Sequence, residues 1–229
     1  MKVMILAAGR GERMRPLTDH TPKPLLLAAG KPLIEHTIKQ LVANGFDDIV
    51  INHAHLGLQI EDCLGDGHQF DANISYAAEG ETALETAGGI INALALLGDE
   101  VFLVVNGDIA TDFAFAELKN LNIDLAHLIL VDNPAHHPGG DFGLDKSGLV
   151  VASSAELFTF SGIGLYRPEL FSTIAVGINK LGPILRQAIA KGRISGQKTD
   201  AFWMDIGTPE RLQQLDFYYS QAVITHKQR

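Results

Sequence analysis

The sequence predicts a single-domain α/β protein with a doubly wound, mostly parallel sheet and an insertion in its second half. Short runs rich in Val, Ile and Leu alternate with longer helical patterns, and this alternation is typical of layered α/β folds with right-handed crossovers. The first and fourth runs are continuously apolar, as strands covered on both faces are. The 229 residues are 46% hydrophobic, which is enough to build a substantial core.

The first half of the chain carries the alternating pattern. Between the first two apolar runs, Leu33, Thr37 and Leu41 recur at helical spacing, and Gly45 ends the pattern. The other segments between runs have the same kind of spacing. We therefore expect strands at residues 3–7, 48–52, 73–77 and 101–105, and helices at residues 32–44, 56–64 and 86–97.

The pattern becomes looser from about residue 124. A strand there leads into a loop rich in glycine and proline, which surrounds a short Phe142-Gly143-Leu144 strand, and a later strand contains a glycine bend. We find no repeat, low-complexity tract or flexible linker. The expected elements are strands at residues 125–131 and 158–166 and helices at residues 181–191 and 210–221.

Composition excludes several classes of protein. The formal net charge of −9 argues against a general nucleic-acid binder, which needs a broad basic face. No stretch approaches the roughly 20 apolar residues of a membrane span, and the apolar start is too short for a signal peptide. We expect a cytoplasmic protein with neither nucleic-acid nor membrane partners. Cys63 is the only cysteine, which excludes an intramolecular disulfide, and its helical setting predicts a small buried side chain.

Residues 6–26, LAAGRGERMRPLTDHTPKPLL, form an unusual loop for such an acidic chain. The loop follows the first strand, where α/β sheets bind ligands, and Gly9 and Gly11 allow backbone N–H groups to approach a phosphate. Like charges repel unless an anion lies among them, so the sequence predicts a triphosphate cradle; an ordinary turn with solvated arginines is the alternative. Its cationic residues are Arg10, Arg13, Arg15 and Lys23.

Two familiar phosphate-binding motifs do not fit this loop. A dinucleotide fingerprint needs a third glycine where Met14 stands, which argues against a nicotinamide-dependent oxidoreductase. A Walker loop needs Gly-Lys-Ser/Thr after four intervening residues, and the loop has none. The predicted cradle is therefore of a different kind.

Two aspartates could bind the Mg²⁺ ion that accompanies a triphosphate. This ion prefers one or two carboxylates together with phosphate oxygens and water. Asp108 closes the apolar run that ends at Val105, and Asp205 precedes the last helix. Each alone is also an ordinary turn residue. The histidines His53, His55, His136 and His137 lack a third matching ligand, so we interpret them as structural or solvated.

These motifs together resemble the signature of the sugar-phosphate nucleotidyltransferases. The signature comprises residues 6–13, Pro16-Leu17-Thr18, Pro22-Lys23-Pro24-Leu25, the Gly107-Asp108 pair and residues 203–209. The resemblance implies a single Rossmann-like nucleotidyltransferase domain over residues 1–229. Residues 1–110 would form the nucleotide-binding half, and residues 111–229 the sugar-phosphate-binding half.

The resemblance also implies roles for individual residues. Arg13, Lys23 and Asp108 would be catalytic, and Asp108 and Asp205 would hold Mg²⁺. The nucleotide would be bound by Ala8, Gly9, Gly11, Glu12, Arg13, Lys23, Glu79, Gly80, Gly88 and Gly89. The sugar phosphate would be bound by Asn106, Gly143, Glu156 and Lys180. Close helix–sheet packing is the alternative for Gly88 and Gly89, as a plain surface position is for Glu156.

The substrates follow from the same resemblance. The chain ends soon after the WMDIGTPERL stretch, with no room for the β-helix or acyltransferase domain of larger relatives. Compact members of this kind imply uridylyl transfer from UTP to N-acetylmuramate 1-phosphate in the recycling of cell-wall sugars. The alternatives are another hexose 1-phosphate such as glucose or mannose 1-phosphate, cytidylyl transfer to a small alcohol phosphate, or a catalytically silent nucleotide sensor. No exposed apolar stripe indicates an oligomeric interface.

Overall fold

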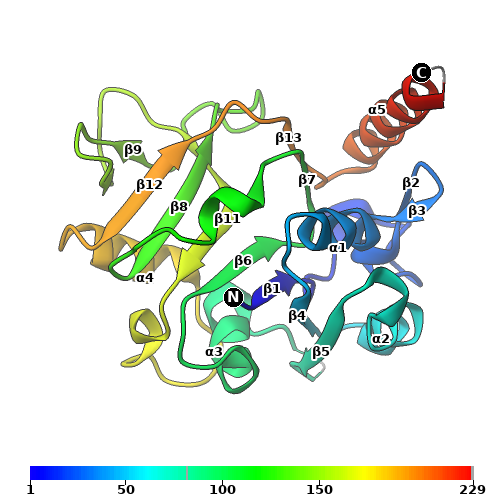
Figure 1. Cartoon of the computed structure of the whole chain (residues 1–229), viewed down its shortest axis with the longest axis horizontal. Helices are drawn as coiled ribbons and strands as arrows, with labels where there is room; N and C mark the ends of the chain where they lie inside the picture. Colours follow the sequence, from blue (N-terminus) through cyan, green and yellow to red (C-terminus); the bar gives the residue numbers. More distant parts are fainter. Residues whose placement is uncertain (81, 228–229) are drawn as a thin grey trace.

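A computed structural model describes residues 1–80 and 82–227 and centres on a seven-stranded sheet (Figure 1). The strands lie in the order β12-β8-β11-β6-β1-β4-β5. Only β11 runs against its neighbours, so the sheet is mostly parallel, as the sequence predicts. The strands are β1 (Val3–Leu6), β4 (Asp48–His53), β5 (Asn73–Ala78), β6 (Phe102–Asn106), β8 (Ala126–Val131), β11 (Thr159–Tyr166) and β12 (Ile194–Lys198).

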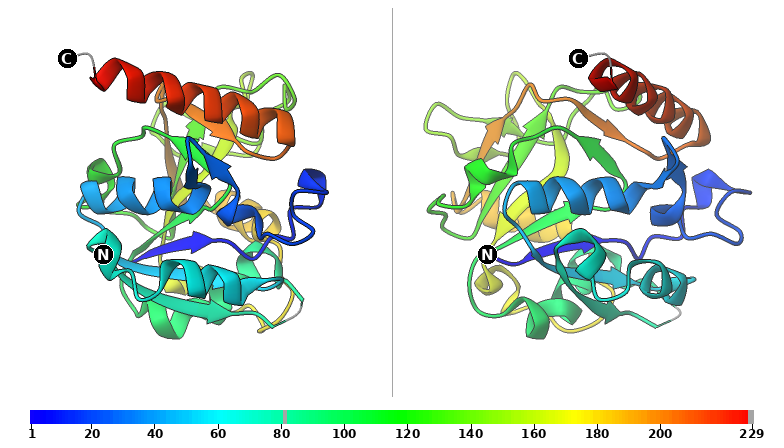
Figure 2. Two further views of the ribbon diagram at one scale, coloured as in Figure 1. Left: turned by 90° about the vertical axis from the view of Figure 1, so that its right-hand side faces the viewer. Right: turned by 45° about the vertical axis from the view of Figure 1, so that its right-hand side comes forward.

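Helices cover both faces of this sheet (Figures 1 and 2). Alternate strand residues point to opposite faces: Met4 and Val104 belong to the core under α3 and α4, whereas Ile5 and Val105 belong to the core under α1 and α2. The double covering explains the continuously apolar strands. The helices are α1 (Leu33–Ala43), α2 (Gly57–Leu64), α3 (Glu85–Leu97), α4 (Leu181–Ile189) and α5 (Pro209–Lys227).

Helix α5 is longer than the predicted helix at residues 210–221. It lies outside the central sheet, at the top of both views in Figure 2, and packs through Leu212 and Leu215 on a third core cluster. Among the described residues, no helix combines the length and apolar character needed to cross a membrane.

The sequence predicts neither β12 nor the short strands other than β9. β12 contains Ser195, Gly196 and Gln197, and this polar edge strand lacks an apolar run. Three small antiparallel ribbons are too short to give a period-2 pattern. They pair β2 (Leu27–Ala28) with β3 (Lys31–Pro32), β7 (Ile109–Thr111) with β13 (Trp203–Asp205), and β9 (Gly143–Leu144) with β10 (Val150–Val151). The expected Phe-Gly-Leu strand corresponds to β9.

The prediction that Cys63 is buried is wrong, since its side chain is exposed. Helix α2 buries Gly57, Ile60 and Leu64. This spacing of three and four residues defines the face turned to the core, and Cys63 falls outside it.

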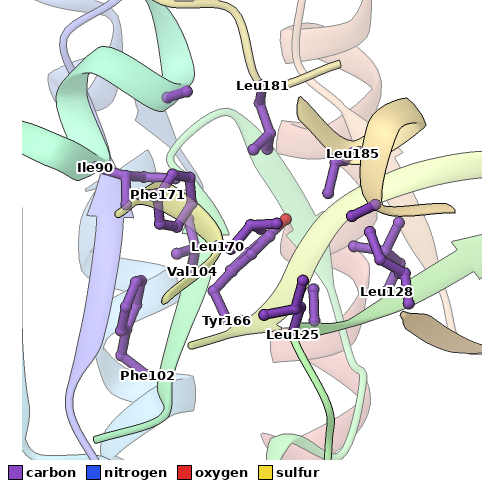
Figure 3. Close-up of a cluster of buried hydrophobic side chains, with 14 of the residues drawn as sticks. Ile90, Phe102, Val104, Leu125, Leu128, Tyr166, Leu170, Phe171, Leu181 and Leu185 are labelled. Atoms are coloured by element: carbon purple, nitrogen blue, oxygen red, sulfur yellow. The ribbon is translucent and has the colours of Figure 1, made fainter. Parts of the chain in front are cut away.

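Tyr166 carries a buried polar atom without a partner. Its ring lies among aliphatic and aromatic side chains of the core shared by α3 and α4 (Figure 3), and only 1% of the residue is exposed. Among the described residues, no hydrogen-bond partner is found for its hydroxyl, and burial raises the pKa of this phenol. A buried hydroxyl without a partner costs stability.

Tyr166→Phe is therefore expected to raise the free energy of unfolding by about 1 kcal/mol, because it removes the unpaired hydroxyl and keeps the ring. Urea denaturation would measure the change. The matched control is Tyr76→Phe, because the Tyr76 hydroxyl donates a hydrogen bond of 2.6 Å to the carbonyl of Gly65. That control is expected to be less stable than the wild type. A loss of stability in Tyr166→Phe would contradict the prediction.

Candidate active site

The carboxyl ends of the central strands form the floor of a cleft of about 460 Å³, within the usual size of a small-molecule site. Leu6 at the end of β1 lies opposite Asn52 of β4 on one side and Asn106 of β6 on the other. From β1 the chain continues to β4 and β5 on one side of the sheet and then to β6 on the other side. This reversal of strand order next to β1 is a topological switch point, where open α/β sheets bind ligands. The cleft is lined by Leu6, Ala7, Ala8, Gly9, Gly11, Glu12, Arg13, Met14, Lys23, Pro24, Asn52, Glu79, Ala83, Glu85, Thr86, Asn106, Gly107, Asp108 and Gly207.

The loop after β1 forms one wall and is held in place by its own residues. Gly11 adopts a left-handed φ of 66°, and the Thr18 hydroxyl donates a 2.9 Å hydrogen bond to the Gly11 carbonyl. Met14 is fully buried and anchors the short 3-10 helix η1 (Glu12–Met14) in the core beside α5. The Pro-Leu-Thr part of the motif therefore fixes the shape of the glycine-containing part.

Gly11→Ala is expected to lower kcat/KM for the nucleotidyl transfer that the sequence resemblance implies by about a hundredfold. A side chain at this position would combine a left-handed φ with contacts of 2.9 Å to Thr18 and 3.1 Å to the Lys23 stem, so the loop has to shift. A displacement of 1 Å in a positioned group can cost this much. Pyrophosphate-release kinetics would measure the loss. Gly30→Ala is the matched control, because Gly30 has a similar φ of 74°, meets nothing within 4 Å of the position its Cβ would take, and lies outside the cleft lining.

The four cations of this loop do not act together. Arg13 and Lys23 line the cleft, whereas the exposed Arg10 and Arg15 lie outside its lining. Arg15 donates a 2.6 Å hydrogen bond to Asp19, which raises the pKa of the guanidinium. The pairing of Arg15 with Asp19 reduces the repulsion among the four cations within the loop itself. Of the four, Arg13 and Lys23 are the ones placed to contact a ligand in the cleft.

Asp108 lies at the rim of the cleft, just beyond β6. Its carboxylate Oδ2 accepts a 2.6 Å hydrogen bond from Lys23 Nζ, which reaches across from the 3-10 helix η2 (Lys23–Leu25). The Lys23 side chain is only 9% exposed, and that of Asp108 is 38% exposed. The two residues that sequence reasoning assigned separately to phosphate and metal therefore form a partly buried ion pair.

Asp205 comes close to Asp108 through the backbone of the β7–β13 ribbon. It lies opposite Ile109, and the N–H of the next residue, Ile206, donates a 2.7 Å bond to the Asp108 carbonyl. The Asp205 carboxylate is half-buried, does not line the cleft, and lies 3.1 Å from Arg211 and 3.0 Å from His136.

The sequence did not indicate the contacts that His136 and Arg211 make. The His136 ring nitrogen lies 3.0 Å from the predicted metal ligand Asp205 and 2.7 Å from Arg211, contacts that agree with the interpretation of His136 as a structural residue. Arg211 follows Asp205 by six residues in the same motif, and this proximity in the sequence could have indicated their contact. His136 lies in a distant loop, so its position in the sequence does not indicate a contact with Asp205.

A hydrogen-bond network holds the wall opposite the glycine loop. Asn52, which is 2% exposed, accepts a bond from the Ala7 N–H and donates one to Glu79, whose other oxygen accepts a bond from the Leu84 N–H. Glu85, the next residue, has a left-handed φ of 63°, a strained conformation of the kind found at functional sites. The network ties β1, β4 and the start of α3 together at the cleft.

The glycines at the start of α3 have packing reasons. A Cβ at Gly88 would collide with the carbonyl of Gly177, and one at Gly89 would collide with Glu79 and Asn52. Neither glycine lines the cleft, which favours the packing alternative, although their contact with a base stays a prediction. Gly80 lines a neighbouring hollow instead.

The predicted sugar-phosphate residues are not brought together by the cleft. Asn106 lines it and packs against Gly162. Gly143 is buried against the carbonyl of Glu156, whose own side chain is exposed, and Lys180 is exposed at the N-cap of α4. Their role in sugar binding stays a prediction.

The charges of the cleft lining are mixed. The cations Arg13 and Lys23 face four carboxylates, those of Glu12, Glu79, Glu85 and Asp108. An anionic triphosphate therefore needs additional positive charge to enter. Among the described residues, no group of three His, Cys, Asp or Glu side chains could enclose a metal ion by itself.

Comparisons with known proteins agree with this geometry. Residues 2–221 match the family model described as nucleotidyl transferase. The chain is 54% identical to an N-acetylmuramate alpha-1-phosphate uridylyltransferase of Neisseria meningitidis serogroup B, over 93% of this chain and 96% of that protein. It is 32% identical to the protein of the same name from Caulobacter vibrioides, over 90% and 92% of the two chains.

The fold has counterparts among solved structures as well. A Bacillus anthracis protein assigned as a glucose-1-phosphate thymidylyltransferase, in complex with sucrose, superposes with a TM-score of 0.83 at 23% identity, over 95% of this chain and 94% of that chain. This similarity confirms the predicted nucleotidyltransferase-type α/β fold. The match over nearly the whole chain and the identity to full-length relatives show that this chain belongs to the nucleotidyl transferase family.

Proposed function

We propose that this nucleotidyltransferase transfers a uridylyl group from UTP to N-acetylmuramate 1-phosphate, releasing pyrophosphate, as a cytoplasmic step in the recycling of cell-wall sugars. The observation that carries the proposal is that the glycine loop, Arg13, Lys23 and Asp108 meet in one cleft. The choice of substrates is supported by the 54% identity to a relative of matching length that bears this name.

The reaction needs positioning and charge neutralisation. A phosphate oxygen of the sugar phosphate attacks the α-phosphorus of UTP in line, forming the new P–O bond while the bond between the α-phosphorus and the bridging oxygen breaks. Residues 8–12 supply backbone N–H groups for the phosphates. Arg13 offers forked donors to the leaving pyrophosphate, and Lys23 offers a compact charge to the α-phosphate or the incoming phosphate.

The carboxylates of Asp108 and Asp205 fit a divalent cation of the Mg²⁺ type. Oxygen donors suit this ion, and two carboxylates leave most positions to phosphates and water. The cleft lining has more carboxylates than cations, so a divalent cation would also balance its charge. When bound, Mg²⁺ neutralises phosphate charge and makes the α-phosphorus more electrophilic. Asp108 faces the cleft directly, whereas Asp205 has to exchange its contacts with Arg211 and His136 to take part.

The two halves of the chain divide the substrates. In the nucleotide-binding half, residues 1–110, the network of Glu79 and Asn52 shapes the wall against which the base lies, next to Gly80, Gly88 and Gly89. Of the predicted sugar-phosphate residues, Asn106 at the end of the first half lines the cleft, and Gly143, Glu156 and Lys180 of the sugar-phosphate-binding half, residues 111–229, would meet the sugar only beyond this lining.

The test is pyrophosphate release by the pure protein with Mg²⁺, crossing four nucleoside triphosphates with N-acetylmuramate, glucose and mannose 1-phosphates. Release with UTP and N-acetylmuramate 1-phosphate, and at least a hundredfold less with the hexose 1-phosphates, is the expected result. Release with glucose or mannose 1-phosphate instead would support the proposed mechanism but contradict the proposed sugar substrate and its place in cell-wall recycling. Nucleotide binding without any release would indicate a catalytically silent nucleotide sensor.

A further inference from the structure

The contact between Lys23 and Asp108 has a consequence for metal binding. Lys23 Nζ lies 2.6 Å from Asp108 Oδ2, and its side chain is the more deeply buried partner. Prolines on both sides, Pro22 and Pro24, fix the short helix that carries Lys23. The Lys23 stem lies against Gly11, so its ammonium stands between Asp108 and the glycine loop.

An ammonium and a divalent cation compete for the same carboxylate. A cation bound to the other oxygen of Asp108 would share one carboxylate with the Lys23 ammonium, and like charges this close repel in a partly buried site. The pairing therefore opposes any divalent cation that arrives at Asp108 alone.

We propose that Lys23 acts as an internal counter-ion that competes with the divalent cation for Asp108 until nucleotide phosphates draw the ammonium away. This proposal rests on the function proposed above and extends it to the order of binding. Lys23 has one point charge and three N–H donors, so it can be bonded to Asp108 or turned to a phosphate. Nucleotide and metal then bind cooperatively, each favouring the arrangement that the other needs.

Asp205 shows the same arrangement on a second carboxylate. Arg211, only 13% exposed, lies 3.1 Å from it, and among the described residues its buried Nε has no hydrogen-bond partner. Both predicted metal ligands are thus neutralised by cations of the chain itself.

The experiment uses Mn²⁺ as the probe, because Mn²⁺ accepts the same oxygen ligands and its free concentration is read by electron paramagnetic resonance. Lys23→Met keeps the stem and removes the charge. Without nucleotide, Lys23→Met is expected to bind Mn²⁺ at least about tenfold more tightly than the wild type. In EDTA, the same variant is expected to bind UTP about tenfold more weakly, since a phosphate partner is gone. A merely structural role for Lys23 would weaken both.

Three controls separate the proposal from its premises. Lys23→Arg keeps a cation and should not tighten Mn²⁺ binding. Lys2→Met removes a charge that lies 4.0 Å from Asp48 at the amino ends of β1 and β4, away from the carboxyl end of β6 where Asp108 lies, and should leave Mn²⁺ binding unchanged. Asp108→Asn, added to Lys23→Met, should abolish the gain.

Unchanged or weaker Mn²⁺ binding by Lys23→Met, including no measurable binding in either protein, would overturn the counter-ion role. A gain that survives Asp108→Asn would also overturn it and would remove Asp108 as the metal ligand. Pyrophosphate release by the wild type tests the proposed function separately from both results.

Discussion

Asp108→Asn is expected to lower kcat by about a hundredfold or more at saturating Mg²⁺. The amide keeps the size of the side chain and one acceptor for Lys23, but it removes the negative charge that a divalent cation needs, and even the supporting contacts of metal ligands cost 10- to 100-fold when removed. Because the side chain lies at the rim of the cleft, the free energy of unfolding should change by less than about 1 kcal/mol. Steady-state pyrophosphate release and urea denaturation measure the two quantities.

Asp124→Asn is the matched control for this variant. Asp124 is an exposed aspartate paired with Arg193 at 2.6 Å, and this pairing holds the pKa of its carboxyl below the usual range. Its loss should leave kcat unchanged. Turnover within a factor of three of the wild type in Asp108→Asn would contradict the proposal that Asp108 holds a divalent cation.

Arg13→Ala is expected to lower kcat by about a thousandfold. Positioned arginines that stabilise charge in phosphoryl transfer contribute about 10³- to 10⁵-fold. Arg13 is exposed in the cleft with its guanidinium directed at Gly207, and the loop that carries it stays anchored by Met14 and Thr18. The loss should therefore appear in turnover and not in stability, as measured by single-turnover kinetics and thermal unfolding.

Two variants separate the charge of Arg13 from its shape. Arg13→Lys keeps a cation without the forked donors and should recover only part of the rate. Arg15→Ala removes a loop arginine that already pairs with Asp19 outside the cleft lining, and should stay within threefold of the wild type. A loss of kcat of tenfold or less in Arg13→Ala would contradict a catalytic role for Arg13.

The parts of the fold that the sequence predicts best are those with long apolar patterns. Strands β1, β4, β5 and β6 and helices α1 and α3 end within a residue or two of expectation, because burial on both faces leaves a continuous apolar run. β12 was not predicted, since an edge strand with a glycine and polar residues carries no such run. Cys63 was misplaced because helical spacing alone does not say which face of α2 turns inward.

The site was predictable where its residues are local in sequence, as in the loop after β1. The Lys23–Asp108 pair, 85 residues apart, was not anticipated, although both residues were selected. His136 reaches Asp205 only because the chain folds back, and neither spacing nor composition encodes that contact. Which charges pair over a long range depends on the tertiary fold. Single motifs therefore predict which residues belong to the site, but not which of them contact one another.

The ribbon of β7 and β13 has a consequence for local opening of the structure. Asp205 lies opposite Ile109 in this ribbon, and the Ile206 N–H donates a hydrogen bond to the Asp108 carbonyl, so the ribbon holds the two aspartates side by side although they are far apart in the sequence. Short elements with few backbone hydrogen bonds open more readily than the central strands of a sheet. Opening of this ribbon would therefore separate Asp108 from Asp205, while the loop after β1 keeps its own hydrogen bond between Thr18 and Gly11.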